Sequence, residues 1–246
     1  MKRLLDVSIA ACALLLLAPL LAAIAVAVWF EDGGSPWYRG VRVGRNGREF
    51  RMLKFRSMRV GASQTGVNST AAGDTRVTGA GRFLRALKLD ELPQLWNVVV
   101  GEMSLVGPRP QVRQDASLYT SEERRMLEVR PGITDLASIV FSDEGEILAG
   151  SADPDLLYNQ IIRPWKSRLA LLYLERNCWS SDARILLWTA GALVSRRWAL
   201  ARVANLLDKW DVGQPLYGIV RRETPLLAYP PPGAREVVAE YRAGVA

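Results

Sequence analysis

The chain has 246 residues, of which 49% are hydrophobic, so it can bury a core and is not a disordered protein. Lys and Arg total 32 against 25 Asp and Glu, and the net charge of +7 predicts a polyanionic partner such as nucleic acid, anionic lipid or a phosphorylated substrate. The chain contains no histidine, and its only cysteines are Cys12 and Cys178, which excludes histidine-dependent catalysis, histidine metal sites and a disulfide framework.

The first predicted element is an apolar helix at the N-terminus. Residues 7–30 carry no charged side chain, and a rise of about 1.5 Å per residue makes them long enough to span a bilayer. A cleaved signal peptide usually has a shorter apolar region, of about 7 to 15 residues. Pro19 predicts a kink near the middle, and Lys and Arg residues beyond both ends favour the cytoplasmic side for each end. We therefore expect a re-entrant membrane helix within residues 1–32, with a kinked spanning helix as the alternative.

A small β-hairpin is predicted next. The cluster "GRNGRE" separates "VRV" from "FRMLKF", and Asn46 and Gly47 suit the positive φ angles of a tight turn. The small polar residues of "GASQTGVNSTAAG", at 61–73, predict a mobile loop, and a loop of this length is often functional. A short helix is then predicted near Gly81.

The stretch "LKLDELPQLW" places two adjacent carboxylates, Asp90 and Glu91, at the start of an apolar helical pattern. Asp90 is a favoured N-cap residue and Pro93 is tolerated in a first turn, so a purely structural cap is one interpretation. The other interpretation is chemical, because Arg85 and Lys88 precede the pair and a helix N-terminus attracts phosphate. A divalent cation would relieve the repulsion between the carboxylates. This combination is typical of phosphoryl transfer.

The segment "GEMSLVGPRP" supports the same chemistry. Two prolines make its last turn rigid, so that Arg109 can present its guanidinium to a phosphate as a bidentate fork. A membrane-tethered nucleic-acid binder is the alternative suggested by the basic composition. We do not expect nucleic acid as a partner, because the sequence contains no recognised nucleic-acid motif or interleaved aromatic platform.

The last third of the chain is predicted to be helical and then irregular. Helices are expected to begin at Pro154 and Pro164, and a third over "ARILLWTAGALVSRRWALARVANLL" is expected to be capped by Ser181 or Asp182. The pattern of the third helix suits the lipid headgroup region and equally suits a buried core or a dimer interface. Residues 201–246 are predicted to be a C-terminal extension, whose role the pattern does not indicate.

Three motifs, with the proline-bearing apolar segment before them, resemble the bacterial sugar transferases, a family of monotopic phosphoglycosyl transferases. They are "RVGRNGREFRMLKFRSM", "GDTRVTGAGRFLRALKLDELPQLWNVVVGEMSLVGPRP" and "RPGITDLAS". The resemblance covers about residues 1–140 in the family's order. It implies an α+β, mainly helical catalytic domain over residues 33–200, with interfacial helices, on the cytoplasmic face of a bacterial inner membrane.

The resemblance also implies an activity and a site. The expected enzyme transfers a sugar 1-phosphate from a UDP-sugar to a polyprenyl phosphate such as undecaprenyl phosphate, releases UMP and initiates glycoconjugate or exopolysaccharide assembly. By the family's motif, Asp90 would be the nucleophile that carries a covalent phosphosugar, Asp90 and Glu91 would hold Mg²⁺, and Arg85 would bind phosphate. Further residues implied to bind substrate are Lys54, Arg56, Asp74 and Arg109.

The chain departs from the family's pattern at three positions. Ala18 stands before the proline where Ser is frequent, Asp135 stands where Gly is frequent, and Ser138 stands where Gln is frequent. The last two changes lie where nucleotide or sugar contacts could differ, so the donor sugar is not inferred from the resemblance. A catalytically silent membrane scaffold of the same fold is the alternative function, and the sequence leaves open whether the chain forms a homodimer.

Overall fold

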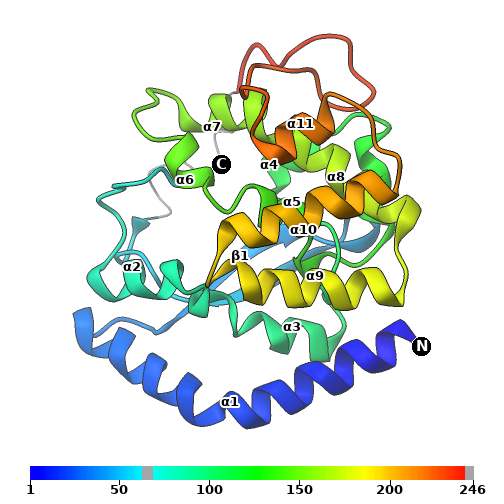
Figure 1. Cartoon of the computed structure of the whole chain (residues 1–246). Coiled ribbons are helices and arrows are strands. Elements are labelled where there is room, and N and C mark those ends of the chain that lie inside the picture. Colours follow the sequence, from blue (N-terminus) through cyan, green and yellow to red (C-terminus); the bar gives the residue numbers. More distant parts are fainter. Residues whose placement is uncertain (63–68, 242–246) are drawn as a thin grey trace.

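The computed structural model of the chain describes residues 1–62 and 69–241, so residues 63–68 of the predicted mobile loop lie outside the described residues. Over the described residues the protein is mainly helical, with two two-stranded sheets. Figure 1 shows the long helix α1 (Lys2–Asp32) along one side of the molecule, with the other elements stacked against it. The predicted mainly helical α+β class with an N-terminal apolar helix and a small hairpin is confirmed.

Helix α1 is continuous but bent. Figure 1 shows both of its ends turned toward the rest of the molecule, with the bend near the middle of the helix, where Pro19 lies. Proline has no N–H to donate and its ring crowds the preceding turn, which explains the bend. Only four of the 31 residues of α1 are buried. Among the described helices, α1 is the one that is long and apolar enough to cross a membrane by length and composition.

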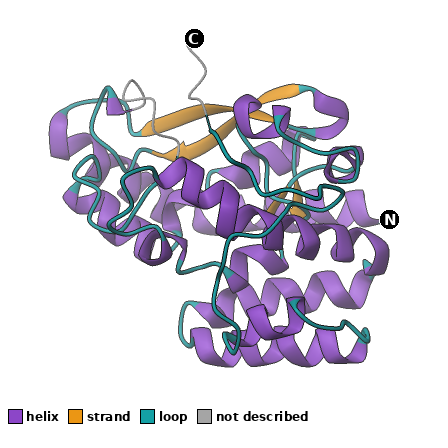
Figure 2. Cartoon of the chain, turned by 90° about the horizontal axis from the view of Figure 1, so that it is seen from above, coloured by secondary structure: helices purple, strands orange, loops and turns teal. Residues whose placement is uncertain are grey.

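The predicted hairpin is present. Strand β1 (Trp37–Val43) pairs antiparallel with β2 (Glu49–Phe55), and Figure 2 shows these strands at one edge of the molecule. The connecting turn η1 (Arg45–Gly47) holds Asn46 at φ 58° and Gly47 at φ 73°, as its sequence predicts.

One side chain fastens the hairpin to helix α3 (Gln94–Val100). The amide oxygen of Asn97 accepts a hydrogen bond from Leu53 N at 2.9 Å, and its Nδ2 donates to the carbonyl oxygen of Arg51 at 2.9 Å. Asn97 thereby completes the free edge of β2 as a neighbouring strand would. Helix α3 also packs on α1, so the hairpin is fixed relative to the apolar helix.

The second sheet is short and parallel. Strand β3 (Ser104–Val106) pairs with β4 (Gly132–Thr134), and two glycines lie against each other beside it. A Cβ atom on Gly132 would lie 2.1 Å from the backbone nitrogen of Gly107, so the approach requires glycine. The amide of Gly132 donates to the carbonyl oxygen of Pro108 at 3.0 Å. The two segments "GPRP" and "RPGIT" are therefore held together by their backbones.

Short helices and turns surround the two sheets. Asp153 caps the predicted helix at Pro154 by accepting from Leu156 N at 2.9 Å, and Pro164 lies in the first turn of the next long helix, so both predicted starts are confirmed. Between residues 79 and 176 the chain also forms the following helices and turns: α2 (Gly79–Ala86), η3 (Leu89–Glu91), α4 (Arg113–Ser117), η4 (Glu123–Glu128), α5 (Leu136–Val140), α6 (Glu144–Ile147), α7 (Pro154–Leu157), η5 (Tyr158–Ile162) and α8 (Arg163–Arg176).

The single long helix predicted after residue 182 is wrong. The structure has two helices there, α9 (Trp179–Ala192) and α10 (Arg196–Lys209). The N-cap of α9 is Cys178 instead of Ser181 or Asp182. Ser195 starts α10 by accepting from Trp198 N at 3.3 Å. A Cβ atom on Gly191 would lie 2.2 Å from the indole of Trp198, so the absence of a side chain lets α10 fold back against α9.

The C-terminal segment packs on the rest of the domain. Helix α10 extends across the predicted boundary at residue 200, and α11 (Leu216–Arg221) packs against it. Beyond α11 the chain is irregular, but Tyr229 packs on Trp165 with ring centroids 4.4 Å apart, and the Tyr241 hydroxyl donates to Asp115 at 2.8 Å. This stretch therefore covers α8 and α4 rather than extending into solvent.

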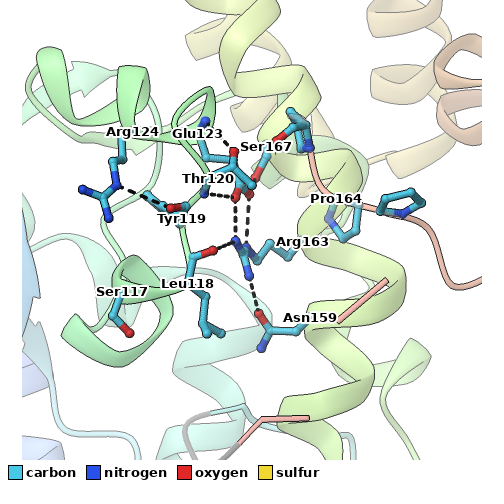
Figure 3. A network of polar contacts seen from close by, with 12 residues as sticks. Ser117, Leu118, Tyr119, Thr120, Glu123, Arg124, Asn159, Arg163, Pro164 and Ser167 are labelled. Atoms are coloured by element: carbon cyan, nitrogen blue, oxygen red, sulfur yellow. Dashed lines mark hydrogen bonds and ion pairs between the residues drawn. The ribbon is translucent and has the colours of Figure 1, made fainter. Parts of the chain in front are cut away.

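A buried ion pair joins η4 to α8 (Figure 3). Arg163 donates from Nε to Glu123 at 3.1 Å and from Nη2 at 2.5 Å, while Ser167 donates to the same carboxylate at 2.6 Å. The remaining Arg163 nitrogen donates to Asn159 at 3.1 Å. Because both charges lie in the interior, removing one of them would leave the other buried without its partner.

Candidate active site

Four of the predicted site residues meet in one charged cluster. Asp90 and Glu91 lie in the single turn η3, Lys54 comes from the end of β2, and Arg109 comes from the turn after β3. The hairpin, η3 and the parallel sheet thus each contribute to the cluster. The elements that carry these residues are separated by up to 55 positions in sequence, so only the fold brings them together.

Asp90 does not cap helix α3. It is the middle residue of η3, and α3 begins at Gln94 with Pro93 at the N-cap and no side-chain cap bond. A capping side chain must directly precede the first helical turn, and Leu92 and Pro93 separate Asp90 from it. The cap-only interpretation of Asp90 is therefore wrong. Lys88, which precedes η3, has a positive φ of 56°, and this left-handed residue reverses the chain into the turn.

Glu91 binds two cations. Lys54 Nζ lies 2.9 Å from Oε1 of Glu91, Arg109 Nη1 lies 3.0 Å from Oε2, and Arg109 Nη2 also binds Oε1. Although burial opposes it, the charges of Arg109 and Lys54 hold the pKa of Glu91 well below its ordinary value. Glu91 therefore stays ionised and fixes both cations in position.

Asp90 has a different environment. It is 4% exposed, and no hydrogen bond to its carboxylate is found within the described residues. Burial raises its pKa and the neighbouring Glu91 raises it further, while the charges of Lys54, Arg85 and Lys88 oppose the rise. Asp90 is thus surrounded by cations, but neither of its carboxylate oxygens accepts a hydrogen bond within the described residues. A nucleophile or a metal ligand requires such available oxygens.

Arg85 lies beside Asp90 and is held by two hydroxyl groups. Its Nε donates to Ser57 Oγ at 3.1 Å, and its Nη2 donates to Thr70 Oγ1 at 3.4 Å. Ser57 was not among the predicted site residues, although it lies within the quoted motif "KFRSM". Asp74 binds Arg76 at 2.7 Å, and this partner lowers the pKa of Asp74 more than Arg85 does.

Arg56 lies outside the charged cluster, at the C-terminal end of α1. Its guanidinium binds both carboxylate oxygens of Asp32 and donates to backbone oxygens at the end of α1, including that of Ser35 at 2.7 Å. Its hydrogen bonds within the described residues include none to Asp90 or Glu91. Arg56 directly follows the last residue of β2, and Lys54 and Arg56 have different acidic partners, Glu91 and Asp32. Arg56 fastens the end of α1 to β2.

The turn that carries Arg109 is fixed by its backbone. The contact of Gly107 with Gly132 and the hydrogen bond from Gly132 N to Pro108 O hold the residue before Arg109. Arg109 Nη1 also donates to Ile133 O at 3.2 Å. The charge of Glu91 and its hydrogen bonds raise the pKa of Arg109 even though burial lowers it. The guanidinium is therefore a permanently charged, rigidly placed group.

Two of the departures from the family's pattern lie next to Arg109. Asp135 and Ser138 line a small cavity together with Arg109. Asp135 caps α5 and accepts from Ser138 N at 2.6 Å and from Ser138 Oγ at 2.7 Å. The two residues thus form one local pair that starts α5.

Asp90 and Glu91 could supply some, but not all, of the ligands of a magnesium ion. Mg²⁺ is commonly held by one or two carboxylates, waters and substrate phosphates. Asp90 offers oxygens without hydrogen-bond partners, whereas both oxygens of Glu91 are shared with Lys54 and Arg109. No group of three or more metal-ligating side chains occurs among the described residues. The site therefore suits an ion that takes most of its ligands from a diphosphate and water.

Comparison with known proteins places the chain in one family. The family model described as bacterial sugar transferase matches residues 1–196. The chain belongs to the bacterial sugar transferase family. The motifs that carry the cluster, from Lys54 to Arg109, lie within the matched residues.

Three relatives show what the chain is similar to. The exopolysaccharide production protein ExoY of Rhizobium meliloti is 44% identical over 56% of this chain and 68% of its own length. A UDP-glucose:undecaprenyl-phosphate glucose-1-phosphate transferase of Klebsiella pneumoniae is 40% identical over 69% of this chain. A UDP-N-acetylgalactosamine-undecaprenyl-phosphate N-acetylgalactosaminephosphotransferase of Aeromonas hydrophila is 41% identical over 56%. The chain spans only 37% and 34% of the last two relatives.

Proposed function

We propose that this protein transfers a sugar 1-phosphate from a UDP-sugar to undecaprenyl phosphate, giving undecaprenyl diphosphate sugar and UMP. The observation that carries the proposal is Asp90, a buried carboxylate with no hydrogen-bond partner among the described residues, set among Lys54, Arg85 and Lys88. Two of the relatives described above are named as transferases of sugar phosphates to undecaprenyl phosphate, which supports the same reaction. The product would begin exopolysaccharide or other glycoconjugate assembly.

In the first step Asp90 is the nucleophile. One of its carboxylate oxygens attacks the sugar-side phosphorus of the UDP-sugar, and a new oxygen–phosphorus bond forms as the bond from that phosphorus to the bridging oxygen breaks. UMP leaves with the bonding electrons. Asp90 then carries a covalent phosphosugar. Glu91 does not attack, because both of its oxygens hold Lys54 and Arg109 in place.

In the second step the lipid acceptor is the nucleophile. A phosphate oxygen of undecaprenyl phosphate attacks the phosphorus of the phosphosugar, and the bond to Asp90 breaks, which restores the carboxylate. Arg85 and Arg109 are placed to bind phosphate oxygens, because a guanidinium offers a planar pair of donors. The charge that develops on the equatorial oxygens is stabilised by these fixed cations.

We propose Mg²⁺ as the cofactor, held by Asp90 and Glu91 together with phosphate oxygens of the donor. The bound ion would neutralise charge on the diphosphate and on the leaving UMP. Glu91 would bind it through an acceptor position that Lys54 and Arg109 leave free, because a carboxylate has about four such positions and three are used. Asp74 is paired with Arg76 near Arg85, and we assign it to support of the phosphate-binding arginine.

We propose that α1 is a re-entrant membrane helix on the cytoplasmic face of a bacterial inner membrane. Its bend, its exposed apolar side chains and the return of both ends toward the same body support this topology (Figure 1). Exposed Phe83 of α2 and Trp96 of α3 lie on elements that pack beside α1, as interfacial side chains would. The long apolar acceptor would then reach Asp90 from the bilayer.

The test is UMP release by purified protein in detergent with Mg²⁺, undecaprenyl phosphate and a panel of UDP-sugars. We expect release with at least one donor, and a loss of at least about 10³-fold in Asp90→Asn. With donor labelled on the sugar-side phosphate and no acceptor, denatured wild-type protein should retain label and Asp90→Asn should not. Asp208→Asn is the matched control, because Asp208 is exposed on α10.

The possible results of these assays test the nucleophile, the covalent intermediate and the transferase activity separately. Unchanged release by Asp90→Asn would contradict the nucleophile assignment. Turnover without a trapped label would contradict the covalent intermediate and favour direct attack by the acceptor. No release from any donor by folded protein would favour the catalytically silent scaffold.

A further inference from the structure

A second cavity lies away from the carboxylate pair, at the N-terminal end of α1. Its volume is about 250 Å³, and neither Asp90 nor Glu91 lines it. Four cationic side chains that are distant in sequence line this cavity: Lys2, Arg3, Arg45 and Arg130. We propose that the cavity binds the phosphate of an anionic membrane-lipid headgroup. The proposal rests on the membrane location of α1 proposed above.

The cavity has an excess of positive charge. Asp6 and Glu128 are the two acidic residues of its lining, against the four cations. Asp6 accepts a hydrogen bond from Ser104 Oγ at 2.7 Å, and its charge offsets part of the charge of Arg3. Arg3 and Arg130 lie close enough to repel each other electrostatically. An anion in the cavity would relieve this repulsion, whereas a cation would increase it.

Arg45 and Arg130 are each held by one hydrogen bond to a backbone oxygen, and their other N–H groups are available to a ligand. Arg130 uses Nε to bind Gly101 O at 2.9 Å, and Arg45 uses Nε to bind Glu128 O at 2.9 Å. No acceptor for the terminal Nη groups of Arg45 or Arg130 is found in the described part of the chain. Each guanidinium is thus oriented by one hydrogen bond while its remaining N–H groups are available. Such groups bind phosphate oxygens in pairs.

The surroundings of the cavity point to a lipid as the source of the phosphate. Lys2 forms an ion pair with Asp182 at 2.5 Å, which joins the first turns of α1 and α9. The same two turns expose Leu4, at 73%, and Trp179, at 55%. Exposed Trp and aliphatic side chains beside clustered cations are typical of protein surfaces at the headgroup level of a membrane.

The experiment measures binding of short-chain lipids to the purified full chain by titration calorimetry, without donor or acceptor. The probes are dihexanoyl-phosphatidylglycerol, dihexanoyl-phosphatidylcholine and inorganic phosphate. We expect the anionic lipid to bind more tightly than the other two. The double variant Arg45→Gln/Arg130→Gln should weaken its binding by about tenfold or more. Arg45→Lys/Arg130→Lys should restore only part of the affinity, because lysine returns the charge but not the paired N–H donors of arginine.

The control variant is Arg48→Gln/Arg51→Gln, which removes the same charge from exposed arginines of the hairpin outside the cavity lining. It should bind as the wild type does, and the thermal melting of all variants is compared to verify folding. Equal binding of phosphatidylcholine, equal binding of inorganic phosphate, or wild-type affinity in the Gln variant would each overturn the proposal. Because no turnover is measured, a protein without transferase activity that binds the lipid would contradict only the proposed function.

Discussion

Two adjacent carboxylates have opposite environments in this site. Glu91 is bound by Lys54 and Arg109, while Asp90 has no hydrogen-bond partner among the described residues. The charges around Glu91 lower its pKa against the effect of burial, whereas burial raises that of Asp90. Such a division assigns one carboxylate to holding the cations and leaves the other available for chemistry.

The buried pair of Glu123 with Arg163 should matter for stability more than for chemistry. Glu123→Ala would leave the Arg163 charge buried without its partner, so we expect the free energy of unfolding to fall by about 3–5 kcal/mol. Glu123 is 0% exposed and the Arg163 side chain is 4% exposed, which prevents water from replacing the lost contact. Urea unfolding in detergent measures the change.

The matched control is Glu175→Ala. Glu175 pairs with Arg125 at 3.4 Å, and both side chains are about half exposed, so its removal should cost about 0–1 kcal/mol. Equal losses in the two variants would show that the burial of Glu123 and Arg163 does not determine their contribution.

Cys178 should be unusually reactive for an exposed cysteine. Hydrogen bonds from the Ser180 side chain and from Ser181 lower its pKa from 9.0 to about 7. The thiolate is the reactive form, so in a Cys12→Ser background the iodoacetamide rate should rise through about pH 7 and level off above it. Ser180→Ala should move the midpoint to higher pH. A midpoint that stays near 9 in the parent protein would contradict the prediction.

At the scale of elements, two glycine contacts decide the path of the chain. Gly107 and Gly132 bring the two strands of the parallel sheet together, and Gly191 admits Trp198 between α9 and α10. The first contact positions Arg109 relative to Glu91, and the second turns a continuous helical pattern into two antiparallel helices. In each case the missing side chain creates the space that the neighbouring segment occupies.

Gly132→Ala should therefore impair catalysis from a distance. Its Cβ would lie 2.1 Å from Gly107 N and 2.4 Å from Gly107 O, so the backbone next to Arg109 must move. A displacement of about 1 Å can cost about 100-fold in rate, and we expect UMP release to fall by this order. The control Gly213→Ala places its Cβ where no atom lies within 4 Å. Full activity in folded Gly132→Ala would show that the turn does not position Arg109.

At the scale of the whole molecule, the bent helix α1 is attached at both ends to the domain that holds the charged cluster. Arg56 binds the end of α1 at Asp32, and Arg3 near its start donates to Val99 O at 3.1 Å. Both ends are thus attached to the same body (Figure 1), which supports the re-entrant topology proposed for α1.

The topology can be tested by cysteine labelling. In a variant lacking Cys12 and Cys178, one cysteine is placed in an N-terminal tag and another, in a separate protein, at exposed Ala149. We expect a membrane-impermeant maleimide to label neither in intact spheroplasts and both after lysis. Labelling of the N-terminal cysteine alone in intact spheroplasts would establish a spanning helix instead.

The sequence by itself determined the local features of this protein. The phosphate site that the spacing of acidic and basic residues predicts at Asp90 stays a prediction. The apolar length and Pro19 predicted the bent N-terminal helix, and Asn46 and Gly47 predicted the hairpin turn, and both are present in the structure. These features depend on steric preferences and charges of neighbouring residues, which a linear pattern contains.

Only the tertiary structure decided which charges meet. In the folded chain Lys54 and Arg109 both bind Glu91, while Asp90 has no hydrogen bond among the described residues. Arg56 lies at the end of α1. The tertiary structure also separated α9 from α10 and brought four cations around the cavity at the start of α1. Ion pairs and burial depend on distances between segments remote in sequence, and those distances follow from packing rather than from any local pattern.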